Sequence, residues 1–305
     1  MYAHLQRLFG EQVQQNQPLA RYTSARVGGA AEILLTVHNA EELAQAVQLL
    51  WQADAPFIVL GGGSNVLICD DGLAGVTILN RARAIRIDAN TPEPSVWAES
   101  GTNFGLLARQ LAAQGLGGIQ WAAGIPGTLG GAIVGNAGAH GGDMAHDLIS
   151  AQVLLRSGEL VEMSNARLQF SYRSSWFKQH PNQAVILAAT LRLRRESPAD
   201  IQAQMDEWVA YRKRTQPPGA STGSMFKNPP GNYAGRLIEA AGLKGLCSGE
   251  AQISPIHANF FVNLGNATAA DFATLIRTAR AAVQQQFGIT LELEVGLLGD
   301  WSDML

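Results

Sequence analysis

The segment GGGSN at residues 61–65 has the residue types of a phosphate-binding turn. It follows the apolar run PFIVL, and backbone N–H groups that no side chain crowds can wrap the oxygens of an anion, with the Ser64 hydroxyl as a further donor. The spacing is not that of a dinucleotide fingerprint, because Val66 stands where a third glycine is required, and the chain has no Gly-Lys pair for a Walker A loop. A tight turn without a ligand explains this segment alone equally well.

A second glycine-rich segment, GIPGTLGGAIVGNAGAHGG, occupies residues 124–142. Glycine inside an element costs stability, so this density needs a reason. A flexible linker would carry more serine, proline and charge, and would not contain LGGAIV. We therefore interpret the segment as a loop that approaches a ligand closely. Two such loops about 60 residues apart indicate one extended dinucleotide.

Three further segments carry side chains that can act on a substrate. Arg173 lies between aromatic residues in FSYRSSWF, where a rigidly held guanidinium can bind a carboxylate, although an aromatic core segment with one exposed arginine is the simpler interpretation. Ser224 in STGSMFKNP has no nucleophile elbow around it, which leaves its hydroxyl available as an acid unless the segment is only a loop. In LELEV, Glu292 and Glu294 share one face of a predicted strand, where solvated carboxylates are the usual case.

Histidines and aspartates cluster near residue 143 and raise the question of a metal site. His140, His146, Asp143 and Asp147 match neither HExxH nor a Cys/His finger, and no third ligand is evident. We expect surface or loop-capping roles for them and no bound metal.

Hydrophobic periodicity places these residues on alternating helices and strands, and therefore predicts an α+β fold. Helices are predicted at residues 40–53, with Asn39 as N-cap, 103–115, 199–214, 232–242 and 267–288. Strands are predicted at residues 56–60, 75–79, 85–88, 95–100, 151–163 (a hairpin turned at Ser157-Gly158), 184–195, 259–264 and 289–298. The change in character near residue 197 indicates a domain boundary there.

Composition limits the classes of function. The 305 residues are 47% hydrophobic and 15% charged, enough for two cores, and the net charge of −3 gives no reason to expect nucleic acid or an anionic membrane as partner. No signal peptide or membrane anchor is evident, so we expect a cytoplasmic protein. We expect Cys69 and Cys247 to be reduced thiols, and a single disulfide between them is the alternative. The sequence does not set the oligomeric state and is compatible with a monomer.

The chain resembles the UDP-N-acetylenolpyruvoylglucosamine reductase family (UDP-N-acetylmuramate dehydrogenases) in five segments that occur in the same order. They are VLGGGSN, AGIPGTLGGAIVGNAGAHGG, FSYRSSWF, GSMFKNP with AGRLIEAAGLKG, and LELEV, and upstream TSARVGGAAEILL also fits. Each segment alone is of middling specificity, whereas the five in order are very specific. The resemblance spans roughly residues 20 to 298. The chain lacks the long insertion that carries a substrate-covering tyrosine in one branch of the family, and so resembles the shorter branch.

The resemblance implies FAD bound in a fold of the vanillyl-alcohol-oxidase type, built by the first two of three domains, with the UDP-sugar in the third. It implies that NADPH reduces the flavin and that the enolpyruvyl double bond then receives the hydride, giving the peptidoglycan precursor UDP-N-acetylmuramate. We accordingly predict an FAD-binding region at residues 1–197, in two subdomains divided near residue 66, and a substrate domain at residues 198–288. The strand within residues 289–305 can pair with either.

The same resemblance assigns site residues. It implies catalytic roles for Arg173, Ser224 and Glu294, which neutralise the growing enolate-like charge, deliver the proton and polarise the developing acid, respectively. Predicted FAD contacts are Gly61, Gly62, Gly63, Ser64, Asn65, Gly124, Ile125, Pro126, Gly127, Thr128, Gly130, Gly131, Asn136 and Gly138. Predicted substrate contacts are Tyr172, Lys227, Asn228 and Lys244.

Two positions depart from the family pattern, and two other functions remain as alternatives. Gly296 stands where the family commonly has arginine, and Gly135 where it often has methionine. A flavin-dependent alcohol or lactone oxidase of the same fold would explain the glycine loops but not GSMFKNP followed by AGLKG. A non-enzymatic nucleotide-binding module would give no joint role to Arg173, Ser224 and Glu294.

Overall fold

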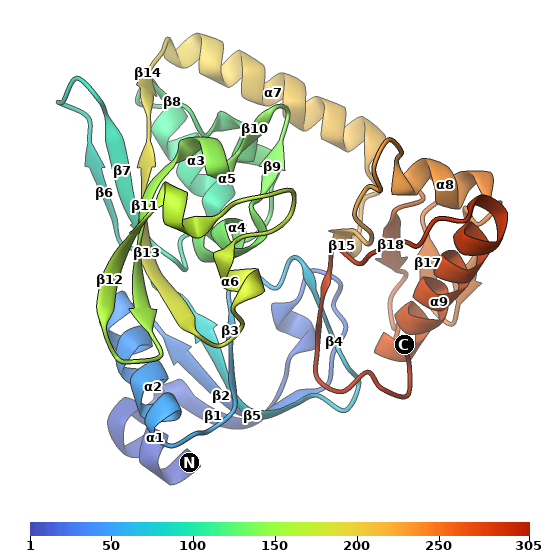
Figure 1. The fold of residues 1–305 in the computed structure, drawn as a ribbon, viewed down its shortest axis with the longest axis horizontal. Coiled ribbons are helices and arrows are strands. Elements are labelled where there is room, and N and C mark those ends of the chain that lie inside the picture. Colours follow the sequence, from blue (N-terminus) through green and yellow to red (C-terminus); the bar gives the residue numbers. More distant parts are fainter. The chain divides into compact units, whose positions relative to one another are not determined.

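The computed structural model describes residues 1–305 and divides into two compact units (Figure 1). The first unit comprises Met1–Val13, Leu34–Gly62 and Thr77–Tyr211, and the second comprises Gln14–Ile33, Gly63–Val76 and Arg212–Leu305. Helices and strands alternate along the chain, as the periodicity predicts. No helix combines the length and the apolar character that crossing a lipid bilayer requires.

The first unit contains a five-stranded antiparallel sheet of order β12-β11-β13-β7-β6, and its hydrophobic core packs against this sheet. The strands are β6 (Ile85–Asp88), β7 (Ser95–Glu99), β11 (Leu148–Leu155), β12 (Leu160–Ser164) and β13 (Ala184–Arg192). Apolar residues of α3 (Phe104–Ala112) and α4 (Leu129–Gly135) pack against these strands in one buried cluster. The predicted turn at Ser157-Gly158 is confirmed, because Leu154 pairs with Leu160 across it.

Local signals explain where the helices of the first unit begin. The Asn39 side chain accepts a hydrogen bond from Glu42 N and caps α2 (Ala40–Gln52), whose first turn carries two acidic residues that favour the positive end of the helix dipole. The Asn103 side chain caps α3 in the same way through Leu106 N. Both predicted helices are thereby confirmed.

A second sheet has the order β1-β2-β5-β3. Its strands are β1 (Val13–Pro18), β2 (Ala30–Val37), β3 (Phe57–Leu60) and β5 (Leu73–Asn80). The remaining short elements are α1 (Tyr2–Phe9), η1 (Gly10–Gln12), η2 (Ala20–Tyr22), β8 (Leu116–Gly117), η3 (Gln120–Gly124), β9 (Gly138–Ala139), β10 (Gly142–Asp143), α5 (Met144–Asp147), η4 (Asn165–Leu168), α6 (Trp176–Gln179) and β14 (Arg194–Arg195).

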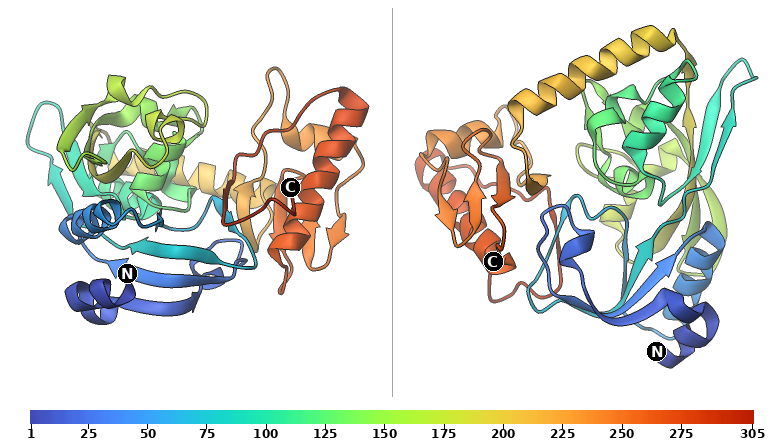
Figure 2. Two further views of the ribbon diagram at one scale, coloured as in Figure 1. Left: turned by 60° about the horizontal axis from the view of Figure 1, so that its bottom comes forward. Right: turned by 180° about the vertical axis from the view of Figure 1, so that it is seen from behind.

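The second unit contains an antiparallel sheet of order β15-β18-β17-β16 with two helices (Figure 2). The elements are β15 (Ala220–Ser224), α8 (Ala234–Ala240), β16 (Cys247–Ser248), β17 (Ala251–Ile253), β18 (Phe260–Asn263) and α9 (Ala269–Phe287). A capping box between Thr268 and Asp271 starts α9, and both Asp70 carboxylate oxygens accept backbone N–H groups of its first turn. The two cysteines are free thiols.

The unit bounds differ from the predicted division. The boundary between the units falls at Arg212, inside the continuous helix α7 (Pro198–Thr215), whereas the predicted division lies near residue 197. Residues 63–76 join the second unit because β4 (Val66–Ile68) pairs in parallel with β19 (Gly296–Leu298). The strand predicted at residues 289–298 is correspondingly shorter, since only its last three residues form a ladder.

Candidate functional site

In the first unit the two glycine loops pack against each other, Gly61 against the Thr128 side chain and Gly62 against the Gly127 backbone. A Cβ atom at Gly61 would lie 2.3 Å from Thr128 Oγ1, and one at Gly62 would lie 2.9 Å from Gly127 Cα. Real Cβ atoms essentially never come this close to other heavy atoms. Glycine is therefore required at both positions by the protein itself, before any ligand is considered.

Six further glycines of the second loop fall into two groups. An added Cβ atom would collide with Asp143 at Gly138 and with Trp121 at Gly142, and at Gly130 it would press against Ser100, 3.0 Å from its Cβ. At Gly131, Gly135 and Gly141 an added Cβ atom would meet open space or one contact at 3.6 Å. Only the second group can leave room for a ligand, so close approach to a ligand accounts for part of the glycine content and internal packing for the rest.

The predicted turn GGGSN is divided between the two units. Gly61 and Gly62 belong to the first, whereas Gly63, Ser64 and Asn65 belong to the second. Gly63 has φ 58°, and a Cβ there would lie 2.0 Å from Tyr22 O. The Asn65 side chain donates to Glu294 O at 3.1 Å, and Asn65 O accepts from Gly296 N. Asn65 thus holds the backbone that carries Glu294.

The predicted FAD contacts at the start of the second glycine-rich loop, residues 124–128, have structural partners as well. Gly124 ends the η3 turn, Ile125 N donates to Ala122 O, and Pro126 follows. Thr128 caps α4 by accepting a hydrogen bond from Gly131 N. Thr102, whose carbonyl accepts a hydrogen bond from Leu129 N, carries a buried hydroxyl with no hydrogen-bond partner in the protein.

Arg173 sits at the tip of a tight turn in the first unit. Ser171 and Ser174 exchange backbone hydrogen bonds across it, and Arg173 has the left-handed φ of 55°. The guanidinium donates long hydrogen bonds to Asn136 O (3.5 Å) and Gly138 O (3.3 Å) and lies 5.5 Å from the Tyr172 ring centroid. Tyr172 is 55% exposed. This turn therefore brings the predicted arginine to the glycine-rich loop.

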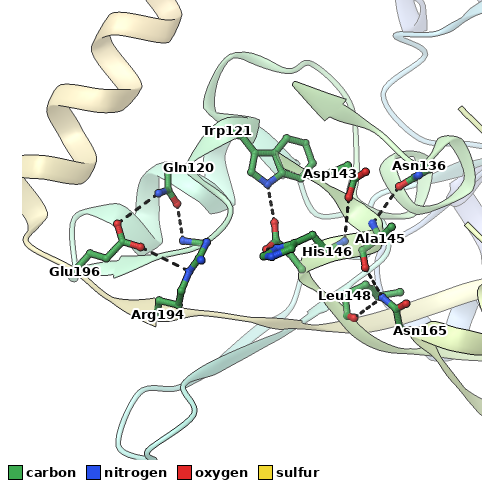
Figure 3. A network of polar contacts seen from close by, with 12 residues as sticks. Gln120, Trp121, Asn136, Asp143, Ala145, His146, Leu148, Asn165, Arg194 and Glu196 are labelled. Carbon is green, nitrogen blue, oxygen red and sulfur yellow. Dashed lines mark hydrogen bonds and ion pairs between the residues drawn. The ribbon is translucent and has the colours of Figure 1, made fainter. Parts of the chain in front are cut away.

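His140 and His146, in and just after this loop, have structural partners, and Figure 3 shows those of His146. Asp147 is buried, and its carboxylate accepts from Trp121 Nε1 at 2.7 Å and contacts His146 Nδ1 at 2.8 Å. Asp143 caps α5 through His146 N. His140 stacks on Trp208 with ring centroids 4.8 Å apart. The structure contains no group of three or more such side chains placed to hold a metal ion.

In the second unit, Ser224 and Glu294 are brought to adjacent backbone positions. Ser224 ends β15, and the following residue, Met225, accepts a hydrogen bond through its carbonyl from Glu294 N at 2.9 Å. Lys227 N in turn donates to Glu292 O, so the two segments run side by side although they form only an isolated bridge. Glu294 is half-buried.

Glu292 has a different environment from Glu294. Its side chain is 73% exposed and pairs with Lys227 Nζ at 3.2 Å. An exposed pair of this kind contributes little to stability. The backbone of Glu294 is bonded on both sides, because its N–H donates to Met225 O and its carbonyl accepts from the Asn65 side chain.

Ser224 and Asn228 line a pocket of about 330 Å³ within the second unit. The other lining residues are Tyr233, Gly235, Arg236, Glu239, Ile256, His257, Ala258 and Asn259. Asn228 Oδ1 accepts from Ala234 N at the start of α8, and Lys244 Nζ pairs with Glu239 Oε1 at 2.7 Å. Of the predicted substrate contacts, Asn228 lines the pocket itself, and Lys244 contacts one of its walls.

The sequence reasoning missed His257, Asn259 and the other walls of this pocket. Burial lowers the pKa of His257, with nearby Lys244 adding to the effect, while a backbone hydrogen bond and Glu239 oppose it. Asn259 N donates to His257 Nδ1, so the neutral ring carries its proton on Nε2. The only available signal was that His257 closely precedes the predicted strand at residues 259–264.

Family models match both parts of the chain. Residues 31–164 match the FAD binding domain, and residues 215–298 match the C-terminal domain of UDP-N-acetylenolpyruvoylglucosamine reductase. These matches place the glycine loops in the first model and Ser224, the pocket and Glu294 in the second.

Relatives match over nearly the whole length. The UDP-N-acetylenolpyruvoylglucosamine reductase of Chloroflexus aggregans is 45% identical over 93% of this chain and 96% of its own. That of Rubrobacter xylanophilus is 42% identical over 97% and 98%. The crystal structure of the Thermus caldophilus enzyme, 37% identical, superposes with a TM-score of 0.80 over 94% of this chain and 99% of its own.

Proposed function

Because the chain belongs to the UDP-N-acetylenolpyruvoylglucosamine reductase family, we propose that it uses NADPH to reduce the enolpyruvyl group of UDP-N-acetylglucosamine enolpyruvate to UDP-N-acetylmuramate. Membership makes the chain an FAD-containing oxidoreductase of peptidoglycan synthesis with the predicted α+β, vanillyl-alcohol-oxidase-type fold. The match of residues 215–298 to the reductase C-terminal domain speaks against the alternative oxidase.

The loops of the first unit fit a bound flavin nucleotide. Gly131, Gly135 and Gly141 leave open space where side chains would project, and the buried Thr102 hydroxyl has no protein partner. The backbone around these glycines, together with Asn136 and Thr128, would hold the FAD. When bound, FAD takes a hydride from NADPH and supplies it to the terminal carbon of the enolpyruvyl group.

The pocket of the second unit fits part of a UDP-sugar. It combines cationic and amide side chains, Arg236 and Asn228, with the exposed aromatic ring of Tyr233. Its volume of about 330 Å³ lies in the lower range of ligand sites. We assign the second unit to the substrate and the first to FAD.

Three side chains would carry the proton and the charge. Hydride addition to the terminal carbon leaves negative charge on the adjacent carbon and its carboxylate. Arg173 neutralises this charge, Ser224 Oγ delivers the proton to the adjacent carbon, and Glu294 hydrogen-bonds the developing acid. The placement of Ser224 in a pocket wall, one residue from the hydrogen bond between Met225 and Glu294, is the observation that supports this proposal most.

Ser224→Ala tests the assignment when the two half-reactions are followed separately by flavin absorbance in stopped flow. We expect reduction by NADPH to stay within about twofold and reoxidation by the enolpyruvyl substrate to fall by about 10²–10³-fold. Ser221→Ala is the matched control, because Ser221 lies on the same strand but outside the pocket. Equal loss of both half-reactions in Ser224→Ala would contradict the role of proton donor.

A further inference from the structure

We propose that Asn136 is a positioning residue for Arg173, fixing through one buried amide both the end of the glycine-rich helix and the turn that carries the arginine. The inference rests on the proposed role of Arg173 and adds to the predicted contact of Asn136 with FAD. It assigns to the Asn136 side chain a function in the substrate half-reaction.

The backbone of Asn136 already has a special conformation. Asn136 ends α4 with φ 43° and ψ 59°, the left-handed region, and only 6% of its surface is exposed. Asparagine tolerates this region better than most residues, so the helix can end here with the side chain directed into the protein. The residue type is therefore compatible with the turn, and the side chain remains available for other contacts.

The side-chain amide connects two other segments to this helix end. Nδ2 donates to Ser171 O at 2.9 Å, and Oδ1 accepts from Ala145 N at 3.1 Å, a bond drawn in Figure 3. Asn136 itself is buried, whereas Ser171 is exposed and Ala145 half-buried, so loss of the amide chiefly removes the link between these segments. Asn136 thus ties α4, the start of the segment that leads into β11, and the first residue of the arginine turn to one another.

The arginine turn depends on this connection. Arg173 has a left-handed φ, which a non-glycine residue adopts only when its surroundings hold it there. Its guanidinium points back to the carbonyls of Asn136 and Gly138, and Ser175 Oγ donates to Val134 O on α4. Two side chains outside the turn bond to its backbone, Asn136 Nδ2 to Ser171 O and Lys178 Nζ to Arg173 O at 3.0 Å, and of these two residues only Asn136 is buried.

Misplacing a catalytic group by about 1 Å costs roughly 10²-fold in rate. Loss of the Asn136 amide should therefore slow the step in which Arg173 acts. In a protein that already lacks the Arg173 side chain, loss of the Asn136 amide should have little further effect on this step.

Asn136→Gly removes the amide and keeps the left-handed backbone, and Asn165→Ala is its matched control. Asn165 Nδ2 donates to Ala145 O and Leu148 O, so it holds the same loop without touching the arginine turn (Figure 3). If the glycine variant fails to fold, Asn136→Asp replaces it, because aspartate keeps the acceptor for Ala145 and loses the donor for Ser171.

The first readout needs neither substrate nor turnover. Guanidinium ¹⁵N NMR of the FAD-loaded protein, with the Arg173 signal identified from Arg173→Lys, reports whether rotation about the Cζ–Nη bonds is restricted. We expect restricted rotation in the wild type and in Asn165→Ala, and free rotation in Asn136→Gly. The proposal would be overturned if rotation stayed restricted in Asn136→Gly. It would also be overturned if rotation became free in Asn165→Ala as well as in Asn136→Gly.

The second readout is a double-mutant cycle on reoxidation of dithionite-reduced flavin by the enolpyruvyl substrate. Asn136→Gly should slow this step about 10- to 100-fold alone and less than about twofold on top of Arg173→Ala. Additive losses would overturn the inference. If the wild type itself is not reoxidised by this substrate, the proposed function fails, and the NMR result still decides whether Asn136 positions Arg173.

Discussion

The glycine loops of the first unit and the pocket of the second unit are built in opposite ways. At Gly62 and Gly127 the two main chains lie directly against each other, and Gly61 lies against the Thr128 side chain, so the packing depends on residues that carry no side chain. In the pocket, the walls are ordinary side chains from several separate segments, among them Ser224, Arg236 and His257. The glycine loops therefore depend on missing side chains, whereas the pocket depends on the side chains that line it.

This difference determines how each region responds to change. Where backbone packs on backbone, any added atom must move the main chain, so a substitution acts on folding and binding together. Where side chains line a pocket, single groups can be removed while the backbone stays, so a substitution acts on one chemical step.

The largest effect should come from a side chain of the second unit. Glu294→Gln should lower kcat by about 10²–10³-fold, because it removes charge from a group proposed to act on the reacting carbon, while the free energy of unfolding changes little. Glu292→Gln is its control two residues away and should stay within about twofold, since Glu292 is exposed and paired with Lys227. Steady-state NADPH oxidation measures both. Equal losses in the two variants would remove the distinction between the carboxylates.

Gly62→Ala should act on folding in the first unit. Its Cβ would lie 2.9 Å from Gly127 Cα, so the main chain must shift, at a cost of about 1–3 kcal/mol in the free energy of unfolding. Gly135→Ala is the matched control, because its Cβ meets nothing within 4 Å and alanine is up to about 1 kcal/mol better than glycine in a helix. Urea denaturation of the FAD-free proteins compares them. The contrast between packed and open glycines fails if both variants lose the same stability.

Gly131→Ala should separate ligand contact from packing. The nearest atom to its Cβ would be Thr128 Oγ1 at 3.6 Å, an ordinary contact, so the FAD-free protein should keep its stability. If FAD lies against this backbone, the added methyl group should weaken FAD binding by about tenfold, or about 1.4 kcal/mol. Fluorescence titration of the FAD-free protein with FAD gives the affinity. Unchanged affinity would mean that Gly131 does not face the flavin.

The contrast also explains what could be predicted from the sequence. Local signals were sufficient for the cap at Asn39, for the helix that follows Asn103 and for the hairpin at Ser157-Gly158, because each depends on a few neighbouring residues. The glycine loops were recognisable since a backbone that must pass close to another backbone leaves a run of glycines in the chain. Their packing against each other was not predicted, because no local pattern distinguishes a glycine that faces protein from one that faces a ligand.

Features that depend on distant residues were missed or placed differently. The alternation in ITLELEV predicts a long strand, yet only Gly296–Leu298 has a ladder partner, in Val66–Ile68. The same pairing draws residues 63–76 into the second unit. His257 carries no motif, and only the fold brings it to Ser224 and Asn228 in the pocket wall.

The smallest effect should be a dependence of stability on pH that belongs to the pocket alone. The backbone contact between Gly62 and Gly127 has no titratable group, whereas burial lowers the pKa of His257 below its ordinary value of 6.5. As pH falls through 6.5, the unfolded chain binds a proton at His257 that the folded protein does not yet take up, so the free energy of unfolding decreases until the lowered pKa is reached. Above 6.5 this contribution to stability is fully present.

In His257→Gln the decrease in the free energy of unfolding between pH 6.5 and the lowered pKa should disappear, while His4→Gln, on an exposed position of α1, should retain it. Urea midpoints measured from about pH 5 to about pH 8 provide the comparison. An unchanged slope in His257→Gln would show that the pocket keeps this ring protonated as readily as water does, and the pocket would then lose its distinction from the loops in its response to pH.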